Sequence, residues 1–227
     1  MPCRNPPKKP ASKPSHPRPR PPQQVRIIGG VWKRSPLPVL DAAGLRPTPD
    51  RVRETVFNWI RHLRDGVQGA RCLDLFAGSG ALGFEAASRG AQEVTLIEAH
   101  TPAFKQLEAN KAKLGATQVN IIRADALVAA QHMAARGQQF DLIFLDPPYQ
   151  QGWLERVLPL CERLLAADGL IYAESSRSLD LDALPPGEAV PDWLLPWQVV
   201  RADQAGMVFY QLLQRKTVPE ILPKIQA

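Results

Sequence analysis

The sequence predicts an α/β protein with a mainly parallel central sheet and helices on both of its faces. From residue 71 onward, segments typical of strands alternate with segments of helical periodicity, and this order demands parallel strands. The segment Leu142–Leu145 is continuously apolar, as expected for a strand that helices cover on both sides. A chain of 227 residues has room for one such domain and short extensions.

The predicted elements follow one another in a regular order. The alternating strands and helices are expected, in turn, at Cys72–Phe76, Ala81–Arg89, Val94–Glu98, Pro102–Leu114, Val119–Ile122, Ala126–Ala135 and Phe140–Leu145. A helix near Trp153–Leu165 and a strand at Leu170–Ala173 come next. Two last strands, near Gln198–Arg201 and Met207–Leu213, flank a turn and predict an antiparallel hairpin at the edge of the sheet.

A short extension is expected ahead of this sheet. Val25–Ile28 and Val31–Trp32 flank two glycines, a pattern that predicts a small hairpin. A helix should follow, with Thr48 as its N-cap and Pro49 in the first helical position. We therefore divide the chain into an arm (1–24), the hairpin and helix (25–64), a main domain (65–215) and a tail (216–227).

The net charge of +6 is concentrated near the N-terminus. Residues 1–24 hold six basic residues, no acid and nine of the 23 prolines, a composition that predicts a disordered arm. Residues 25–64 carry eight bases against three acids. Such a basic end fits a nucleic-acid partner, although it equally fits a solvated tail that aids solubility. The arginines expected to contact RNA are Arg46, Arg51, Arg53 and Arg61.

The cysteine and histidine patterns exclude several classes of site. Cys3, Cys72 and Cys161 are widely spaced and odd in number, so they form neither a disulfide framework nor a zinc pattern. The four histidines are scattered, and no stretch reaches the roughly 18 apolar residues of a membrane span. We expect no bound metal, no membrane segment and a cytoplasmic location.

A glycine-rich turn is expected where the first strand of the sheet enters its helix. Gly78, Gly80 and Gly83 fit the dinucleotide-binding pattern, so an NAD-dependent oxidoreductase must be considered. Four acids end successive strands and should surround one pocket: Asp74, Glu98, Asp125 and Asp146. An acid beside the turn repels a pyrophosphate but suits a sulfonium cation, an ammonium group and ribose hydroxyls. The pattern therefore indicates S-adenosylmethionine.

Each acid has an expected role toward that cofactor. Glu98 should accept the ribose hydroxyls and Asp125 the adenine amine, while Asp74 and the glycine turn hold the methionine end. For Asp125, a simple helix-capping role is the stronger alternative. The predicted cofactor-binding residues are Asp74, Phe76, Ala77, Gly78, Gly80, Glu98, Asp125 and Ala126.

The motif Asp146-Pro147-Pro148-Tyr149 follows a buried strand and predicts the catalytic centre. Two prolines fix the backbone and leave the Pro147 carbonyl without a regular partner. That carbonyl and the Asp146 carboxylate can accept both N–H bonds of an aryl amine, while Tyr149 stacks on the base and Pro148 contacts the RNA. The alternative is a plain rigid turn.

In this order, the glycine turn, acidic strand ends and Asp-Pro-Pro-Tyr resemble the class I amino-methyltransferases. The segments Arg26–Gly30, Gly44–Trp59, Asp74–Gly83 and Asp146–Tyr149 resemble the bacterial RsmD family more narrowly. This resemblance implies a Rossmann-like, seven-stranded sheet whose last strand is antiparallel. It also implies methylation of a guanine N2 amine in small-subunit (16S) ribosomal RNA, as free RNA or within a ribonucleoprotein particle.

Other functions remain open from the residues alone. The same motif can hold adenine N6, cytosine N4 or a protein glutamine amide, and the arginine-rich helix favours a nucleic acid. A noncatalytic RNA-binding module is the alternative from a different class, and the intact motifs argue against it. We expect the protein to act as a monomer.

Overall fold

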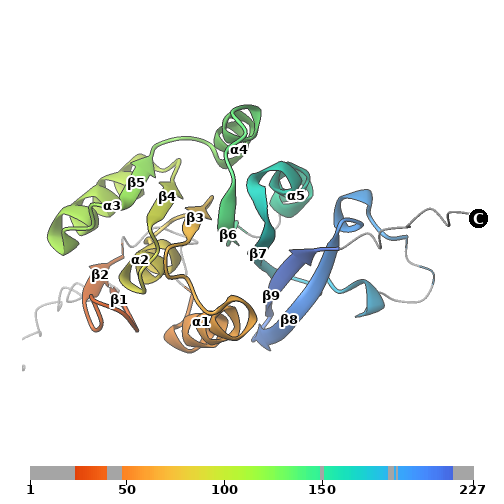
Figure 1. Ribbon diagram of the computed structural model, residues 1–227, viewed down its shortest axis with the longest axis horizontal. Coiled ribbons are helices and arrows are strands. Elements are labelled where there is room, and N and C mark those ends of the chain that lie inside the picture. Colours follow the sequence, from red (N-terminus) through yellow and green to blue (C-terminus); the bar gives the residue numbers. More distant parts are fainter. Residues whose placement is uncertain (1–23, 40–47, 149–150, 184–186, 188, 217–227) are drawn as a thin grey trace, which may run out of the picture.

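The computed structural model describes residues 24–39, 48–148, 151–183, 187 and 189–216, which build one sheet, one small ribbon and the helices around them (Figure 1). The seven strands of the sheet lie in the order β5-β4-β3-β6-β7-β9-β8. Their bounds are β3 Arg71–Asp74, β4 Glu93–Ile97, β5 Val119–Ile122, β6 Phe140–Leu145, β7 Leu165–Ser175, β8 Trp197–Ala205 and β9 Val208–Arg215. The predicted α/β class is confirmed.

Strand direction agrees with the prediction. The pairs from β5 through β7 are parallel, whereas β9 is antiparallel to both β7 and β8. The turn between the last two strands is shorter than expected, because β8 runs to Ala205 and β9 starts at Val208. The register places Tyr172 opposite Leu212 and Glu174 opposite Tyr210. The end of the described chain thus supplies one neighbour of β7.

Helices cover both faces of the sheet. Figure 1 shows α1, α2 and α3 on one side and α4 and α5 on the other. The bounds are α1 Asp50–Arg64, α2 Ala81–Ser88, α3 Thr101–Leu114, α4 Ala126–Ala135 and α5 Trp153–Leu164. Two apolar cores follow from this arrangement, because alternate residues of each strand point to opposite faces. Phe144 and Tyr172 belong to the core under α1, while Leu145 and Ala173 belong to the core under α4 and α5.

The helix α1 packs on the sheet through one apolar stripe. Val52, Val56, Phe57 and Ile60 are buried and recur at helical spacing. Burying each of these side chains stabilises the fold by about 1.5–3 kcal/mol. Thr48 is not its N-cap, contrary to the prediction: Pro49 takes that position, without any side-chain cap hydrogen bond.

The helix α2 lies unusually close to the sheet. A Cβ atom on Gly83 would meet Leu96 Cδ2 at 2.2 Å and Val94 Cγ1 at 3.3 Å. The third glycine of the dinucleotide-like pattern therefore allows the helix to approach β4. This packing role requires no phosphate in the site.

The N-terminal hairpin differs from the prediction. The strand β1, Gln24–Arg26, pairs with β2, Pro36–Pro38, and Val31 is exposed in the connecting turn. The expected second strand does not form because the main chain there bonds to α2 instead. The Val31 amide donates to the Ser88 carbonyl at 2.8 Å, and the Gly29 amide donates to the Glu85 carboxylate at 2.8 Å.

The termini of the chain were predicted to be an arm (1–24) and a tail (216–227). Residues 1–23 and 217–227 lie outside the described residues. Within the described residues, no helix is long and apolar enough to cross a membrane.

Candidate active site

The first part of the site is the turn between β3 and α2. Gly78 and Gly80 both have positive φ, 51° and 77°, which glycine adopts without steric cost. The Glu98 carboxylate, just beyond β4, accepts the Gly78 amide at 2.8 Å and the His100 amide at 2.7 Å. The structure therefore brings the predicted Glu98 and glycine turn together, along with Phe76 and Ala77.

Asp74 lies beneath this turn and is almost fully buried, at 2% exposure. Burial, together with the negative charge of Glu98, raises the pKa of its carboxyl to about 7, although the Phe76 amide donates to it at 3.2 Å. None of the groups that shift this pKa is a cation. A positively charged ligand beside Asp74 would supply the missing counter-charge, so the residues fit S-adenosylmethionine.

Asp125 follows β5 at the same edge of the sheet. Its side chain caps α4 by accepting the Leu127 and Val128 amides at 2.9 and 3.2 Å. The helix-capping alternative is thus confirmed. Its neighbour Ala126 is buried, and the expected contact of Asp125 with adenine stays a prediction.

Asp146 ends β6 and is held by side chains from distant parts of the chain. The Thr48 hydroxyl lies 3.1 Å from Asp146 Oδ2 and 3.1 Å from Glu174 Oε1. The Tyr172 hydroxyl donates to the same Glu174 oxygen at 2.5 Å. Burial and the charge of Glu174, with a smaller effect of Asp74, hold the pKa of Asp146 well above its ordinary value. We call Thr48, Asp146, Tyr172 and Glu174 the carboxyl cluster.

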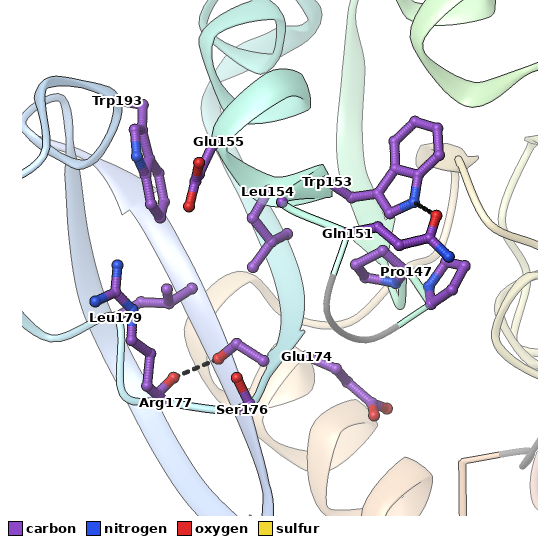
Figure 2. A pocket seen from close by; sticks show the side chains of 13 residues that line it. Pro147, Gln151, Trp153, Leu154, Glu155, Glu174, Ser176, Arg177, Leu179 and Trp193 are labelled. Atoms are coloured by element: carbon purple, nitrogen blue, oxygen red, sulfur yellow. Dashed lines mark hydrogen bonds between the residues drawn. The ribbon is translucent and has the colours of Figure 1, made fainter. Parts of the chain in front are cut away.

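A pocket of about 310 Å³ opens beside this cluster (Figure 2). Pro147 and Pro148 both line the pocket, and Trp193 lies across it from Pro147. The start of α5 and the segment after β7 complete the lining. Figure 2 shows the Glu174 carboxylate directed away from Trp193, on the side of α1. A volume of this size suits a small planar group.

Two predicted site residues, Arg46 and Tyr149, lie outside the described residues. Sequence reasoning missed Thr48, Tyr172 and Glu174 as parts of the site. A signal for two of them was present, since Tyr172 and Glu174 occupy alternate positions, on one face, in the buried second half of β7.

The prediction that Arg53 is exposed for RNA binding is wrong, because its side chain is fully buried. Its guanidinium donates to the Thr48 carbonyl at 3.2 Å and to Asp50 Oδ1 at 2.7 Å, and it lies 3.5 Å from Glu85 Oε2. These contacts tie the segment before α1 to the body of the protein. Arg51 and Arg61 are exposed, as predicted. In the described residues, no group of three or more metal-ligating side chains is arranged to hold a metal.

The antiparallel β9 in a seven-stranded sheet, together with the glycine turn and its acids, defines a class I methyltransferase dependent on S-adenosylmethionine. The sequence profile of the family described as "Conserved hypothetical protein 95" matches residues 25–214. The chain belongs to this family.

Individual relatives agree with that assignment. "Ribosomal RNA small subunit methyltransferase D" of Escherichia coli (strain K12) is 42% identical over 199 residues, which cover 87% of this chain and 93% of the relative. The protein of the same name from Haemophilus influenzae is 38% identical over 195 residues, 84% of this chain and 94% of the relative. The solved structure of a "Putative methyltransferase yhhF from Escherichia coli" matches with a TM-score of 0.70 and 42% identity, covering 86% of this chain and 99% of that one.

Proposed function

We propose that this protein transfers the methyl group of S-adenosylmethionine to the exocyclic N2 amine of a guanine in small-subunit ribosomal RNA. The observation that carries the proposal is the position of Asp146. Its carboxyl is held by Thr48 at the end of β6, next to the two prolines that line the pocket. The names of the relatives supply the class of RNA, and the resemblance of the motifs supplies the base.

The chemistry explains why an acid is needed at this point. An exocyclic amine shares its lone pair with the ring, so it is a weak nucleophile. Hydrogen bonds from its two N–H groups to Asp146 and to the Pro147 carbonyl favour the pyramidal amine, whose lone pair is available for attack. Asp146 also stabilises the positive charge that develops on the nitrogen. Tyr149 stacks on the base in this proposal.

The other half of the site holds the cofactor in this proposal. Glu98 accepts the ribose hydroxyls, since each carboxylate oxygen has lone pairs beyond the main-chain bonds already described. Asp74 lies close to the positive charges of the methionine end, and Asp125 faces the adenine. When bound, the cofactor supplies the methyl group, and its sulfonium charge favours the ionised forms of the nearby acids.

RNA binding is proposed for the exposed part of α1 and for Pro148. Arg51 and Arg61 are exposed and can contact phosphates, while Pro148 is exposed at the mouth of the pocket. Arg46 joins them as a prediction from sequence. We further propose that the protein acts in the cytoplasm as a monomer, on RNA or on a ribonucleoprotein particle.

Single-turnover methylation with labelled cofactor, on small-subunit RNA and on particles, tests this function. Nucleoside analysis should find N2-methylguanosine. The substitution Asp146→Ala should slow methyl transfer by at least about 10², because one preorganised contact to developing charge contributes that much. Its affinity for the cofactor should barely change.

The exposed Asp168 provides a matched control, since Asp168→Ala removes a carboxylate from β7 outside the site. A parent-like rate in Asp146→Ala would contradict the role of Asp146. A product of N6-methyladenosine or N4-methylcytidine would instead show that the assigned base is wrong.

A further inference from the structure

The carboxyl cluster contains one hydroxyl between two acids. Thr48 Oγ1 lies at 3.1 Å from an oxygen of Asp146 and at the same distance from an oxygen of Glu174. A hydroxyl carries a single proton, so it can donate to only one of these two oxygens. Its second short contact is a hydrogen bond only if the other acid is protonated and donates to Thr48.

Two arrangements satisfy both contacts of the Thr48 hydroxyl. In the first, protonated Asp146 donates to Thr48, and Thr48 donates to the Glu174 carboxylate. In the second, protonated Glu174 donates to Thr48, and Thr48 donates to the Asp146 carboxylate. The Tyr172 hydroxyl donates to Glu174 in both. The two states differ by two proton hops, one along each of the 3.1 Å contacts of Thr48.

We propose that Thr48 and Glu174 form a proton relay behind Asp146, in which Glu174 stores the proton that Asp146 must lose before its carboxylate can stabilise the positive charge that develops on the target amine. In this step the Asp146 O–H bond breaks and a Thr48 O–H bond forms. The original Thr48 O–H bond breaks in turn, and a Glu174 O–H bond forms. Charge and atoms balance without any further reactant. Glu174 is thus a positioning residue that acts through Thr48, and its role in catalysis rests on the proposed function.

The charges around the cluster favour a shared proton. Asp146 is faced by Glu174 from β7, whose charge raises its pKa and whose side chain also shares a hydrogen bond with it directly. The charge of Asp74, at the end of β3, raises the same pKa. From the side of α1, the Arg53 guanidinium donates to the Thr48 carbonyl and pairs with Asp50 and Glu85, which are acids outside the cluster. Three acids close together in a buried site cannot easily all be ionised. In the relay, the retained proton lies on Glu174, and Asp146 faces the target amine as a carboxylate.

The relay is tested by titrating the Asp146 carboxyl in the cofactor-free protein, using carbon-13 NMR of labelled aspartate. The spectrum of Asp146→Asn identifies the resonance. Glu174→Gln removes a negative charge, so the pKa of Asp146 should fall by about one unit or more. Thr48→Val removes the hydrogen bond between the Thr48 hydroxyl and Asp146, which favours the ionised carboxylate, so the pKa of Asp146 should rise. The two variants are expected to move one titration in opposite directions.

Matched variants separate this relay from a merely structural role. Thr48→Ser keeps the hydroxyl and should restore the parent titration. Thr95→Val makes the same chemical change at a buried threonine of β4, outside the cluster, and should leave the titration unmoved. Tyr172→Phe removes a donor from Glu174, favours the proton there and should lower the pKa of Asp146. This last variant loses only a hydroxyl, so it keeps the test available if the others unfold.

The pH dependence of single-turnover methylation gives a second readout. The rate should fall on the acidic side of the profile as Asp146 becomes protonated. The midpoint of this fall should lie at lower pH in Glu174→Gln and at higher pH in Thr48→Val. An Asp146 titration that does not move in these variants, or that moves in the same direction in both, overturns the relay. The titration needs neither cofactor nor RNA, so it can succeed even if nucleoside analysis rejects guanine as the substrate.

Discussion

Asp74 and Asp146 end the neighbouring strands β3 and β6, yet they obtain their partners in different ways. Asp74 is held by the amide of Phe76, two residues away, and lies near Glu98, just beyond the next strand along the chain. Asp146 is held by Thr48, 98 residues earlier, and lies beside Glu174 on β7. The cofactor side of the site is thus local in sequence, whereas the catalytic side is assembled from distant segments.

This difference shows why the segment before α1 matters for chemistry. The Thr48 main chain is bonded to Arg53, which also contacts Glu85 on α2. The position of the Thr48 side chain in the carboxyl cluster therefore depends on the ion pair between Arg53 and Glu85, which lies outside the cluster. Changes in that ion pair should affect Asp146 and leave Asp74 in place.

Arg53→Met should give the largest effect, a loss of about 3–5 kcal/mol in the free energy of unfolding. Removing one partner of a buried ion pair leaves the other charge without full compensation. Arg51→Met, on the exposed side of the same helix, should change stability by less than about 0.5 kcal/mol. Urea unfolding of both variants measures the difference. Equal, small losses in the two variants would show that the buried contacts of Arg53 do not stabilise the fold.

The local side can be tested through pH. The pKa of Asp74 is raised to about 7 in the folded protein, so folding favours its protonated form. Its contribution to stability is present below about pH 4 and is lost as the pH rises through about 7, by up to about 4 kcal/mol. In the cofactor-free protein, the free energy of unfolding of Asp74→Asn should not show this decline as the pH rises. Urea unfolding at pH 5 and pH 8 compares the two proteins, and parallel declines would contradict the raised pKa.

Glu98→Ala should weaken cofactor binding by about 1.5–3 kcal/mol, the usual contribution of hydrogen bonds to a charged group. The variant also removes the hydrogen bond that the Gly78 amide donates to the Glu98 carboxylate. RNA affinity and the titration of Asp146 should stay unchanged, because the catalytic side does not depend on this turn. Calorimetry with the cofactor provides the measurement. An unchanged affinity would remove Glu98 from the cofactor site.

The smallest effect is expected on the exposed face of α1. Charge reversal at Arg51 and Arg61 should lower RNA affinity and reduce the salt dependence, by about 0.7 in logarithmic slope for each phosphate that the protein no longer neutralises. The cofactor affinity should not change. Arg136→Glu, at the exposed end of α4 on the opposite face, is the control. The proposed RNA face would be wrong if the control and the double variant had equal slopes.

Sequence patterns predicted the features that depend on neighbouring residues. The alternation of strands and helices, the glycine turn and the antiparallel hairpin all follow from local periodicity and turn residues. The position of Arg53 was wrong because its charge was given more weight than its spacing. Arg53 stands three, four and seven residues before Val56, Phe57 and Ile60, so helical periodicity alone places it on the buried stripe.

The partners of Asp146 could not be predicted in the same way. No local pattern connects Thr48 with a carboxyl 98 residues later. Thr48 and Pro49 also match the usual start of a helix, so the capping prediction concealed the true role of the hydroxyl. Long-range side-chain contacts of this kind depend on how the elements pack, which periodicity does not specify.

The pairing of β9 with β7 has a consequence for folding. Tyr172 and Glu174 gain their second strand neighbour only from residues near Leu212 and Tyr210. During synthesis the cofactor side can form while β7 still has an open edge, and open edges readily pair with other chains. The carboxyl cluster therefore gains this strand neighbour only after β9 has been synthesised. Slow synthesis just before β9 would prolong the state most prone to aggregation.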